Sequence, residues 1–518
     1  MRRGDAFGGK GVMSGQPILW WQRPALLAGL VVLFALPLAL ATIPPLIDLP
    51  AHMARYHVGA TLADSPDLRR YFTFSWRFMP NLGVDIPVIA LAPLIGLEPA
   101  ARLVVTIIPA LAAAAMLLVA RSAHGRVPAT ALIALPLVFA YPMIFGFVNA
   151  CLAVALAFLA FALWLRFDGQ GRTGACALLA AAIAPIVLTA HIVGYGVFGL
   201  AVFGATIGRA IEQRAPWKAA ARDILVACLP VAWPFIILIL WSTGSAPPAG
   251  GWLDWHTRAS WLAGLLRDRW MPVDIVSAAL VYGAMLLPFI RPARFAYALR
   301  LAVPASLLWI LALGLPTTLI TQFASVRLIY IATTLTVLAV RPRGETPPWL
   351  PWTGLAFIAL RLLSVTVSSV EAGQHHDQEL AALDHIARGS RVIALEMMPC
   401  ERNWQPARLT HIPAMATARR DAFVNDQFVT NEGQLMGIRP DQPVLRRWLN
   451  PVVFAKPCAR WPDRPTVRQA LSSLPWGDMD YLWLIDVPPE LRPSDGRLHP
   501  IWRARNSVLY RAAGPPPL

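Results

Sequence analysis

Charged residues are scarce in this chain, and hydrophobic residues are unusually common. Only 14 % of its 518 residues are charged, whereas 57 % are hydrophobic. Ordinary soluble domains contain about 25 % charged residues, so this composition excludes a soluble enzyme of this length. Apolar runs long enough to cross a bilayer recur between residues 24 and 368. They indicate a polytopic α-helical membrane protein.

Acidic residues are also few. The chain has 29 Asp and Glu against 45 Lys and Arg, which gives a formal net charge of +16. The segment from residue 371 onward holds 18 basic and 16 acidic residues, so +14 belongs to the apolar part. Basic residues between apolar runs follow the positive-inside rule, and no basic stripe is interleaved with aromatic residues. The charge therefore excludes a nucleic-acid partner and favours contact with membrane lipid.

Cysteine is rare, with five residues in the chain. Cys151, Cys176 and Cys228 lie in apolar runs, where we expect them to act as small packing residues. Cys400 and Cys458 are the only two cysteines of the tail. If the tail faces an oxidising compartment, each is the only partner available to the other, and the sequence leaves open whether they form a disulfide.

Clusters of arginine between the apolar runs predict the topology. If these clusters are cytoplasmic, the chain has a cytoplasmic N-terminus at 1–23, a transmembrane body of eleven spans at 24–370, and a periplasmic tail at 371–518. The length of the first run favours an uncleaved signal anchor in a bacterial inner membrane over a cleaved signal peptide. The predicted spans are 24–46, 102–120, 128–145, 147–165, 174–191, 192–208, 222–241, 272–290, 300–320, 325–340 and 349–368.

The stretch 84–97 is apolar, but fourteen residues with two prolines are few for a crossing. We therefore expect an interfacial helix within an outer loop at 47–101. This loop also carries Arg55, Arg69, Arg70 and Arg77, against the positive-inside rule. These arginines point to a site on the outer face.

The stretch "IDLPAHMARYHV" (47–58) directly follows the first apolar run. As a helix it places Asp48 at the N-cap and Pro50 in the first turn, with His52 and Arg55 on the same face. A helix cap with a wet surface face explains this spacing equally well. Other polar residues meet the same face at the ends of later spans, and such residues near apolar spans are costly unless they face a cavity. They are Asn149, His191, Tyr195, Gln322 and Arg327.

The D-x-P-x-H-x-x-R pattern formed by Asp48, Pro50, His52 and Arg55 resembles the first outer loop of the GT-C superfamily of integral-membrane glycosyltransferases. The resemblance extends through "WRFMPNLGVDI" (76–86), 145–167 and "TAHIVGYG" (189–196), and so covers the membrane part to about residue 210. It implies a GT-C-like fold and sugar transfer from a polyprenyl-phosphate donor to a glycan, lipid or protein acceptor. Many relatives carry two adjacent or closely spaced acids at this position, whereas in this chain Asp48 is followed by Leu49 and Pro50.

The resemblance and the chemistry of the residues assign expected roles. Asp48 and His52 are the predicted catalytic pair, because the reaction must take a proton from the acceptor hydroxyl. Arginine suits the departing phosphate, because its planar fork pairs with phosphate oxygens. We predict no cofactor and no metal, since the acids are too scattered to support a divalent ion. The predicted donor-binding residues are Arg55, Arg69, Arg70, His191 and Arg327, and the predicted acceptor or sugar contacts are Asn149, Tyr195, Trp252 and Trp255.

The tail predicts a small soluble α/β domain. A helix is expected at 378–389 and strands at 391–396, 480–488 and 506–512. The tail shows no Gly-rich phosphate loop, nucleophile elbow or zinc spacing, and "THIPAMATARRDAFVNDQF" (410–428) is similar to tails of such glycosyltransferases without an assignable role. Two other functions stay open: a transporter or flippase of a lipid-linked glycan, and a non-catalytic envelope assembly protein on the same scaffold.

Overall fold

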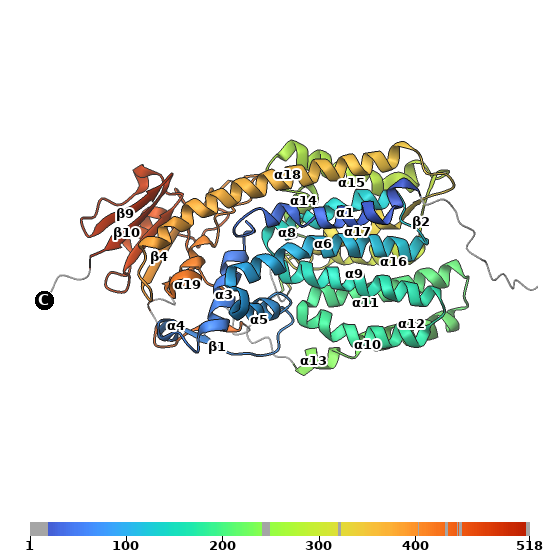
Figure 1. Cartoon of the computed structure of the whole chain (residues 1–518), viewed down its shortest axis with the longest axis horizontal. Helices are drawn as coiled ribbons and strands as arrows, with labels where there is room; N and C mark the ends of the chain where they lie inside the picture. Colours follow the sequence, from blue (N-terminus) through green and yellow to red (C-terminus); the bar gives the residue numbers. More distant parts are fainter. Residues whose placement is uncertain are drawn as a thin grey trace, which may run out of the picture.

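Long apolar helices lie side by side along the long axis of the molecule, and a β-sheet occupies one end (Figure 1). The computed structural model describes residues 19–240, 249–319, 323–401, 403–429, 434–442, 444 and 448–513. Six helices of this part are long and apolar enough to cross a membrane. The fold is that of a polytopic helical membrane protein with a soluble C-terminal region. The six helices are α6 (Leu97–His124), α9 (Val148–Gly169), α10 (Thr173–Ala190), α11 (Ile192–Glu212), α15 (Met271–Ile290) and α18 (Trp349–Leu380).

Shorter helices complete the bundle, and each of the eleven predicted spans contains helix. In α9, 78 % of the most apolar window is buried, against 28 % in α15, so α9 lies centrally and α15 faces lipid. The shorter helices are α1 (Pro24–Leu33), α2 (Leu36–Ala39), α7 (Thr130–Ala134), α8 (Tyr141–Phe145), α12 (Trp217–Ala232), α13 (Phe235–Leu240), α14 (Trp255–Ala263), α16 (Leu299–Gly314) and α17 (Leu328–Ala339).

The first loop folds at the same end of the bundle as the sheet (Figure 1). It contains α3 (Leu49–Thr61), α4 (Pro66–Tyr71), β1 (Phe72–Phe74) and α5 (Asp85–Ile95). With eleven residues, α5 is too short to cross a bilayer. It packs against α3 and the start of α6, as expected for an interfacial helix.

The tail forms an α/β domain around a six-stranded sheet. Strand β4 pairs in parallel with β5, β7 and β8, while β8, β10 and β9 are antiparallel neighbours. Helix α18 runs unbroken from the bundle through residue 371 and ends at Leu380, so it covers only the start of the helix expected at 378–389. A 3-10 helix follows over Ala381–His385, and residues 386–389 are not helical. The elements are β4 (Arg391–Met397), α19 (Met415–Arg420), β5 (Phe423–Val424), β6 (Met436–Ile438), β7 (Val452–Val453), α21 (Val467–Ser472), β8 (Tyr481–Ile485), β9 (Leu498–Ala504) and β10 (Ser507–Ala512).

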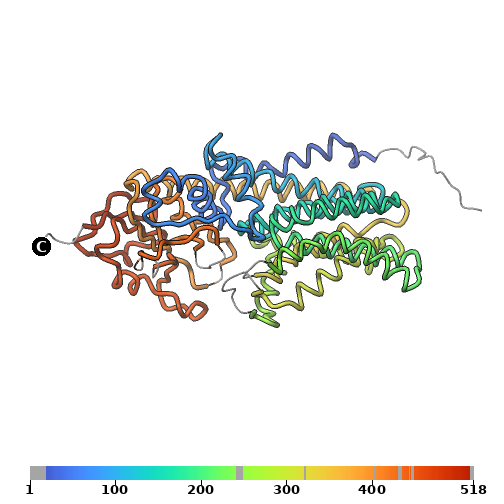
Figure 2. Tube along the Cα trace, turned by 90° about the horizontal axis from the view of Figure 1, so that it is seen from below, coloured from blue at the N-terminus to red at the C-terminus, as the bar shows by residue number. Residues whose placement is uncertain are grey.

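The tail and the first loop are joined into one unit, as Figure 2 also shows. Strand β6 of the tail pairs with β1 of the loop in an antiparallel ribbon. The Arg419 guanidinium forms two hydrogen bonds of 2.7 and 3.0 Å with Glu98, and His57 lies 2.7 Å from the Asp421 carboxylate. Cys400 and Cys458 form a disulfide within the tail, with Cα atoms 5.5 Å apart.

Candidate active site

Asp48 lies between α2 and α3, at the end of the bundle that carries the tail. Its backbone N–H donates to the carbonyl of Phe145 at 3.0 Å, and that of Ile47 donates to Ile144 at 3.4 Å. Gly146, with φ +98°, permits this approach, because a Cβ at this position would lie 2.7 Å from the Asp48 nitrogen. The turn between α8 and α9 therefore fixes the backbone of Asp48.

The Asp48 side chain does not cap α3. Asp48 is the N-cap residue, as the spacing predicts, but its side chain accepts no capping hydrogen bond. The side chain is 13 % exposed, and within the described ranges no group donates a hydrogen bond to its carboxylate. Capping would have been a sufficient structural reason for an aspartate here. Without it, the carboxylate is available for chemistry.

The tail places His411 opposite Asp48. The His411 Nε2 lies 3.9 Å from the Asp48 Oδ1, which permits a charge interaction but is too long for a hydrogen bond. The other ring nitrogen, Nδ1, lies 2.6 Å from the Asp426 carboxylate, to which it donates. The His411 backbone has φ +67°, a left-handed conformation that is uncommon for residues other than glycine and is enriched at functional sites. Asp426 and this turn together set the direction of the ring.

Burial and charge act in opposite directions on the pKa values of this pair. Burial raises the pKa of Asp48 to about 6, against the nearby charges of His411 and Arg327, which lower it. Burial alone would lower the pKa of His411, but the charge and hydrogen bond of Asp426 raise it to about 9. At neutral pH the Asp48 carboxylate is therefore ionised, and the His411 ring is protonated.

A third acid, Glu396 of β4, lies beside this pair. It is buried, and Thr410 donates a 2.7 Å hydrogen bond to it. Burial and the charge of Asp426 raise the pKa of Glu396 to about 7. The tail thus supplies two carboxyl groups and one imidazole next to Asp48 of the first loop.

The helical bundle contributes Arg327, the residue before α17. Its guanidinium carbon lies 3.7 Å from the centre of the Phe147 ring, and its charge acts on Asp48. Phe145 packs against Phe147 at 4.6 Å and against Phe323 at 5.9 Å. An aromatic wall of this kind keeps water away and strengthens the interactions of the charges beside it.

His52 lies one turn after Asp48 and packs against the tail. Its ring centre is 5.2 Å from that of Phe428, which lies 4.9 Å from that of His411. Burial and the charges of Arg55 and His411 lower the pKa of His52 well below its ordinary value. His52 is therefore neutral, and its predicted catalytic role stays a prediction.

Arg55 belongs to a buried network on the bundle side of the loop. Its guanidinium donates to both carboxylate oxygens of Asp85, at 2.8 and 3.0 Å. Asn149 of α9 donates to the same carboxylate at 3.0 Å and accepts a 2.6 Å hydrogen bond from the Val84 backbone. These contacts join α3, α5 and α9. Arg55 and Asn149 thus hold these helices together, and their predicted contacts with donor and acceptor stay predictions.

His191 and Tyr195 make the local hydrogen bonds that polar residues at span ends often make. The His191 Nδ1 accepts a 3.0 Å hydrogen bond from the Val193 backbone and caps α11. The Tyr195 hydroxyl donates to the Val231 carbonyl at 3.0 Å. His191 is also within electrostatic range of Arg327, so of these two it lies nearer to the site.

The other predicted site residues lie on the surface. Arg70 is 60 % exposed and pairs with Asp67, its neighbour in α4, and Arg69 is exposed beside it. Trp252 and Trp255 are 59 % and 55 % exposed. These positions fit interfacial residues, and their predicted contacts with donor or sugar stay predictions. Two further residues, Gln322 of the predicted outer face and Arg402 of the tail, lie outside the described residues, as do residues 1–18 of the predicted N-terminus.

Asp426 and Glu396 are missing from the residues predicted above. The sequence singles out His411 only as a polar tail residue that could contact an acceptor, with a solvated surface as the alternative. His411 and Asp426 lie in the tail segment 410–428, whose similarity to known tails is a further signal for both. In the described part of the chain, no three His, Cys, Asp or Glu side chains meet as a possible metal site. The absence of a metal requirement stays a prediction to be tested.

The fold and this site define a helical membrane protein whose soluble tail completes a polar centre at one end of the bundle. No family model and no curated protein matches the chain. A similar solved structure is ArnT from Cupriavidus metallidurans bound to undecaprenyl phosphate. It is 14 % identical with a TM-score of 0.49, and the match covers 96 % of this chain and 100 % of that one.

The apo state of the same ArnT is also similar. It is 15 % identical with a TM-score of 0.45, and the match covers 94 % of this chain and 98 % of that one. Because these identities and TM-scores are too low to carry a function from one chain to another, the proposal below rests on the geometry around Asp48.

Proposed function

We propose that this protein is a membrane glycosyltransferase that moves a sugar from a polyprenyl-phosphate donor to an acceptor of the cell envelope. One observation carries the proposal: the Asp48 carboxylate follows the first apolar segment, does not cap its own helix, and lies 3.9 Å from His411 within the field of Arg327. A carboxylate and cations side by side at the edge of the bilayer match the two charges that such a transfer develops.

The reaction needs one group that accepts a proton and one that holds an anion. The acceptor oxygen forms a bond to the anomeric carbon, the bond from that carbon to the phosphate oxygen breaks, and its electron pair leaves with the polyprenyl phosphate. Asp48 takes the proton of the acceptor hydroxyl, and its pKa of about 6 suits a base at neutral pH. Arg327 holds the departing phosphate, because a guanidinium stays charged throughout.

The tail supplies a second acid close to the site, where the motif has Leu49 and Pro50 directly after Asp48. Asp426 accepts the 2.6 Å hydrogen bond from His411 and keeps that ring protonated and directed at Asp48. In this arrangement His411 positions Asp48 and balances its charge. The tail domain is therefore part of the active site.

The disulfide between Cys400 and Cys458 supports an oxidising compartment for the tail. We therefore place the tail and Asp48 on the periplasmic face of a bacterial inner membrane, with the N-terminus in the cytoplasm. At this face the polyprenyl chain of the donor stays in the bilayer while its phosphate reaches Arg327.

The test is Asp48→Asn, which keeps the shape of the side chain and removes the base. In a strain deleted for the gene, wild-type protein restores the glycan profile of the envelope, and Asp48→Asn does not. The matched control is Asp64→Asn, an exposed aspartate of the same loop, which restores it. The profiles compared are those of lipopolysaccharide, glycolipid and glycoprotein.

Thermal unfolding of the purified variants separates loss of chemistry from loss of fold. Burial raises the pKa of Asp48 from 3.8 to about 6, so its ionisation reduces stability as the pH rises through this window. Asp48→Asn removes that cost, and the melting temperature at pH 7 should not fall. Full restoration of the glycan by Asp48→Asn would overturn the transferase proposal and favour the transporter or the assembly protein.

A further inference from the structure

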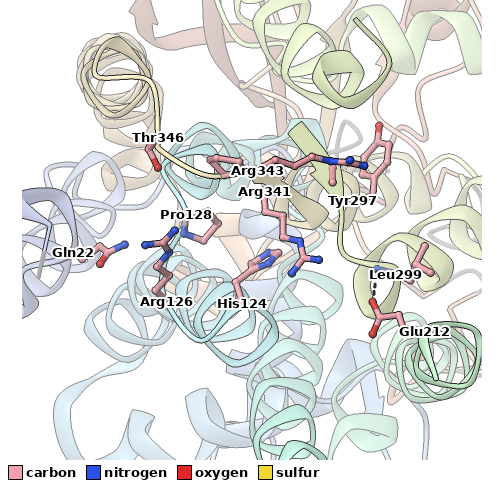
Figure 3. Close-up of a pocket in the computed structure, with 12 residues that line it drawn as sticks. Gln22, His124, Arg126, Pro128, Glu212, Tyr297, Leu299, Arg341, Arg343 and Thr346 are labelled. Atoms are coloured by element: carbon pink, nitrogen blue, oxygen red, sulfur yellow. Dashed lines mark hydrogen bonds between the residues drawn. The ribbon is translucent and has the colours of Figure 1, made fainter. Parts of the chain in front are cut away.

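A cavity of about 490 Å³ lies at the far end of the bundle, opposite the tail (Figure 3). Its walls come from the ends of α6 and α11, the start of α16, and the ribbon of β2 (Phe295–Tyr297) and β3 (Val340–Pro342). Figure 1 places β2 at this end, far from α3. The proposed transferase makes no use of it. Arg126, Arg341, Arg343 and His124 line the cavity, and its size suits a small ligand or a headgroup.

The ribbon holds two of the arginines in place. Arg341 pairs with Ala296 across the two strands, and the Arg343 backbone N–H donates to the Arg294 carbonyl at 2.7 Å. Arg341 lies within β3, and Arg343 lies in the bend directly after it. Both line the cavity with Arg126. The fold therefore concentrates three positive charges around one space.

Other arginines at this end are neutralised within the protein. Arg209 of α11 and Arg300 of α16 both pair with Asp168 of α9. Within the described residues, Arg126, Arg341 and Arg343 form no ion pair with a carboxylate. The single acid of the wall, Glu212, accepts a 3.3 Å hydrogen bond from the Leu299 backbone. The wall thus carries three arginines against one glutamate, so its net charge is positive.

His124 adds a further polar atom. Its Nε2 lies 2.7 Å from the Leu338 carbonyl and must donate, because a carbonyl only accepts. The other nitrogen, Nδ1, is buried without a hydrogen-bond partner in the described part of the chain. In Figure 3 the side chains of Arg126, His124 and Arg341 point into the same space. In a neutral ring with its proton on Nε2, Nδ1 can only accept a hydrogen bond, so the donors available to an anion are the three arginines.

Two tryptophans near the cavity indicate that it lies at the level of the lipid headgroups. Trp20 packs against Trp352 at 4.5 Å between ring centres, next to Gln22, which lines the cavity. Trp352 is mostly exposed. Exposed tryptophans gather at the level of lipid headgroups, and arginine pairs well with phosphate oxygens. We propose that this cavity binds the phosphate group of an anionic membrane lipid, independently of the proposed transferase activity.

The test measures lipid binding directly on the full chain. Purified protein in nanodiscs of phosphatidylcholine with a minor share of phosphatidylglycerol is examined by native mass spectrometry. We expect the triple variant Arg126→Gln, Arg341→Gln and Arg343→Gln to retain phosphatidylglycerol at least about tenfold more weakly than wild type. The matched control removes the same charge from exposed positions at the same end: Arg121→Gln, Arg172→Gln and Arg222→Gln. It should retain the lipid as wild type does.

Two results would overturn the proposal. One is equal loss of phosphatidylglycerol from the triple variant and its control. This result would mean that the three cavity arginines act only through the overall surface charge. The other is displacement of the lipid by inorganic phosphate at equal concentration, which would make the ligand a soluble phosphate. If the triple variant does not fold, Arg126→Gln alone serves, because Arg126 is exposed in the turn after α6.

Discussion

Two polar clusters lie at the tail end of the bundle, and each contains one residue of the D-x-P-x-H-x-x-R motif. They differ in how many hydrogen bonds their charged groups form. In the scaffold cluster, Arg55, Asp85 and Asn149 meet at 2.8 to 3.0 Å and are buried. In the tail-facing cluster, Asp48 is 3.9 Å from His411, and its carboxylate keeps some exposure.

This difference in hydrogen bonding suits the first cluster to stabilising the fold and the second to chemistry. A buried charge that is fully hydrogen-bonded fixes helices to one another, but it has nothing left to offer a substrate. A carboxylate with a raised pKa and an incomplete set of partners costs stability and can exchange a proton. About two helical turns thus separate Arg55 from Asp48, the residue proposed for catalysis.

The largest effect on stability is expected from breaking the scaffold cluster. Arg55→Ala leaves the Asp85 charge buried without its partner, and we expect the free energy of unfolding to fall by about 3–5 kcal/mol. Equilibrium unfolding in detergent measures this loss. Arg69→Ala, at an exposed position of the same loop, is the control and should change stability by less than about 0.5 kcal/mol. Equal losses from the two variants would remove the distinction between the clusters.

A substitution in the tail-facing cluster should lower the rate of transfer and hardly change the free energy of unfolding. His411→Asn removes the cation beside Asp48 and tolerates the left-handed backbone, since Asn adopts this conformation more readily than most residues. We expect transfer to slow by about 10²- to 10⁴-fold, measured as the rate of glycan formation in membranes. His385→Asn, at an exposed position of the tail, should leave the rate unchanged. An unchanged rate in His411→Asn would exclude the tail from the active site.

The smallest and most specific effect is the pH dependence of the wild-type rate. Activity should rise as Asp48 loses its proton near pH 6 and fall as His411 loses its charge near pH 9. The rate is measured across this range with membranes held at constant ionic strength. In His411→Asn the fall at high pH should be absent. A wild-type rate that stays flat from pH 5 to 10 would contradict the assigned roles of both groups.

The helical body could be predicted from hydropathy, because each predicted span contains helix and the loop helix α5 is short, as expected. The tail strands at 391–396, 480–488 and 506–512 correspond to β4, β8 and β10. These elements are visible in sequence because their apolar patterns repeat locally. The predicted boundary between the transmembrane body and the tail, at residue 371, falls inside α18, because this helix continues from the bundle into the tail.

The site could be predicted only in part. Asp48 stands out because a charge beside an apolar run is costly. Arg55 has the right spacing to join it, but its partner Asp85 comes from another helix, which spacing within α3 does not reveal. His411 and Asp426 look like ordinary polar residues of a soluble domain, and only the docking of the tail brings them to Asp48.

The ribbon of β1 and β6 joins segments from opposite ends of the sequence, and the contact between His57 and Asp421 beside it spans 364 residues. During synthesis, α3 is made long before its partner exists. A ribosome must complete nearly the whole chain, and every span must be inserted, before the two halves can meet. Truncated copies that end before the tail therefore cannot bring His411 to Asp48.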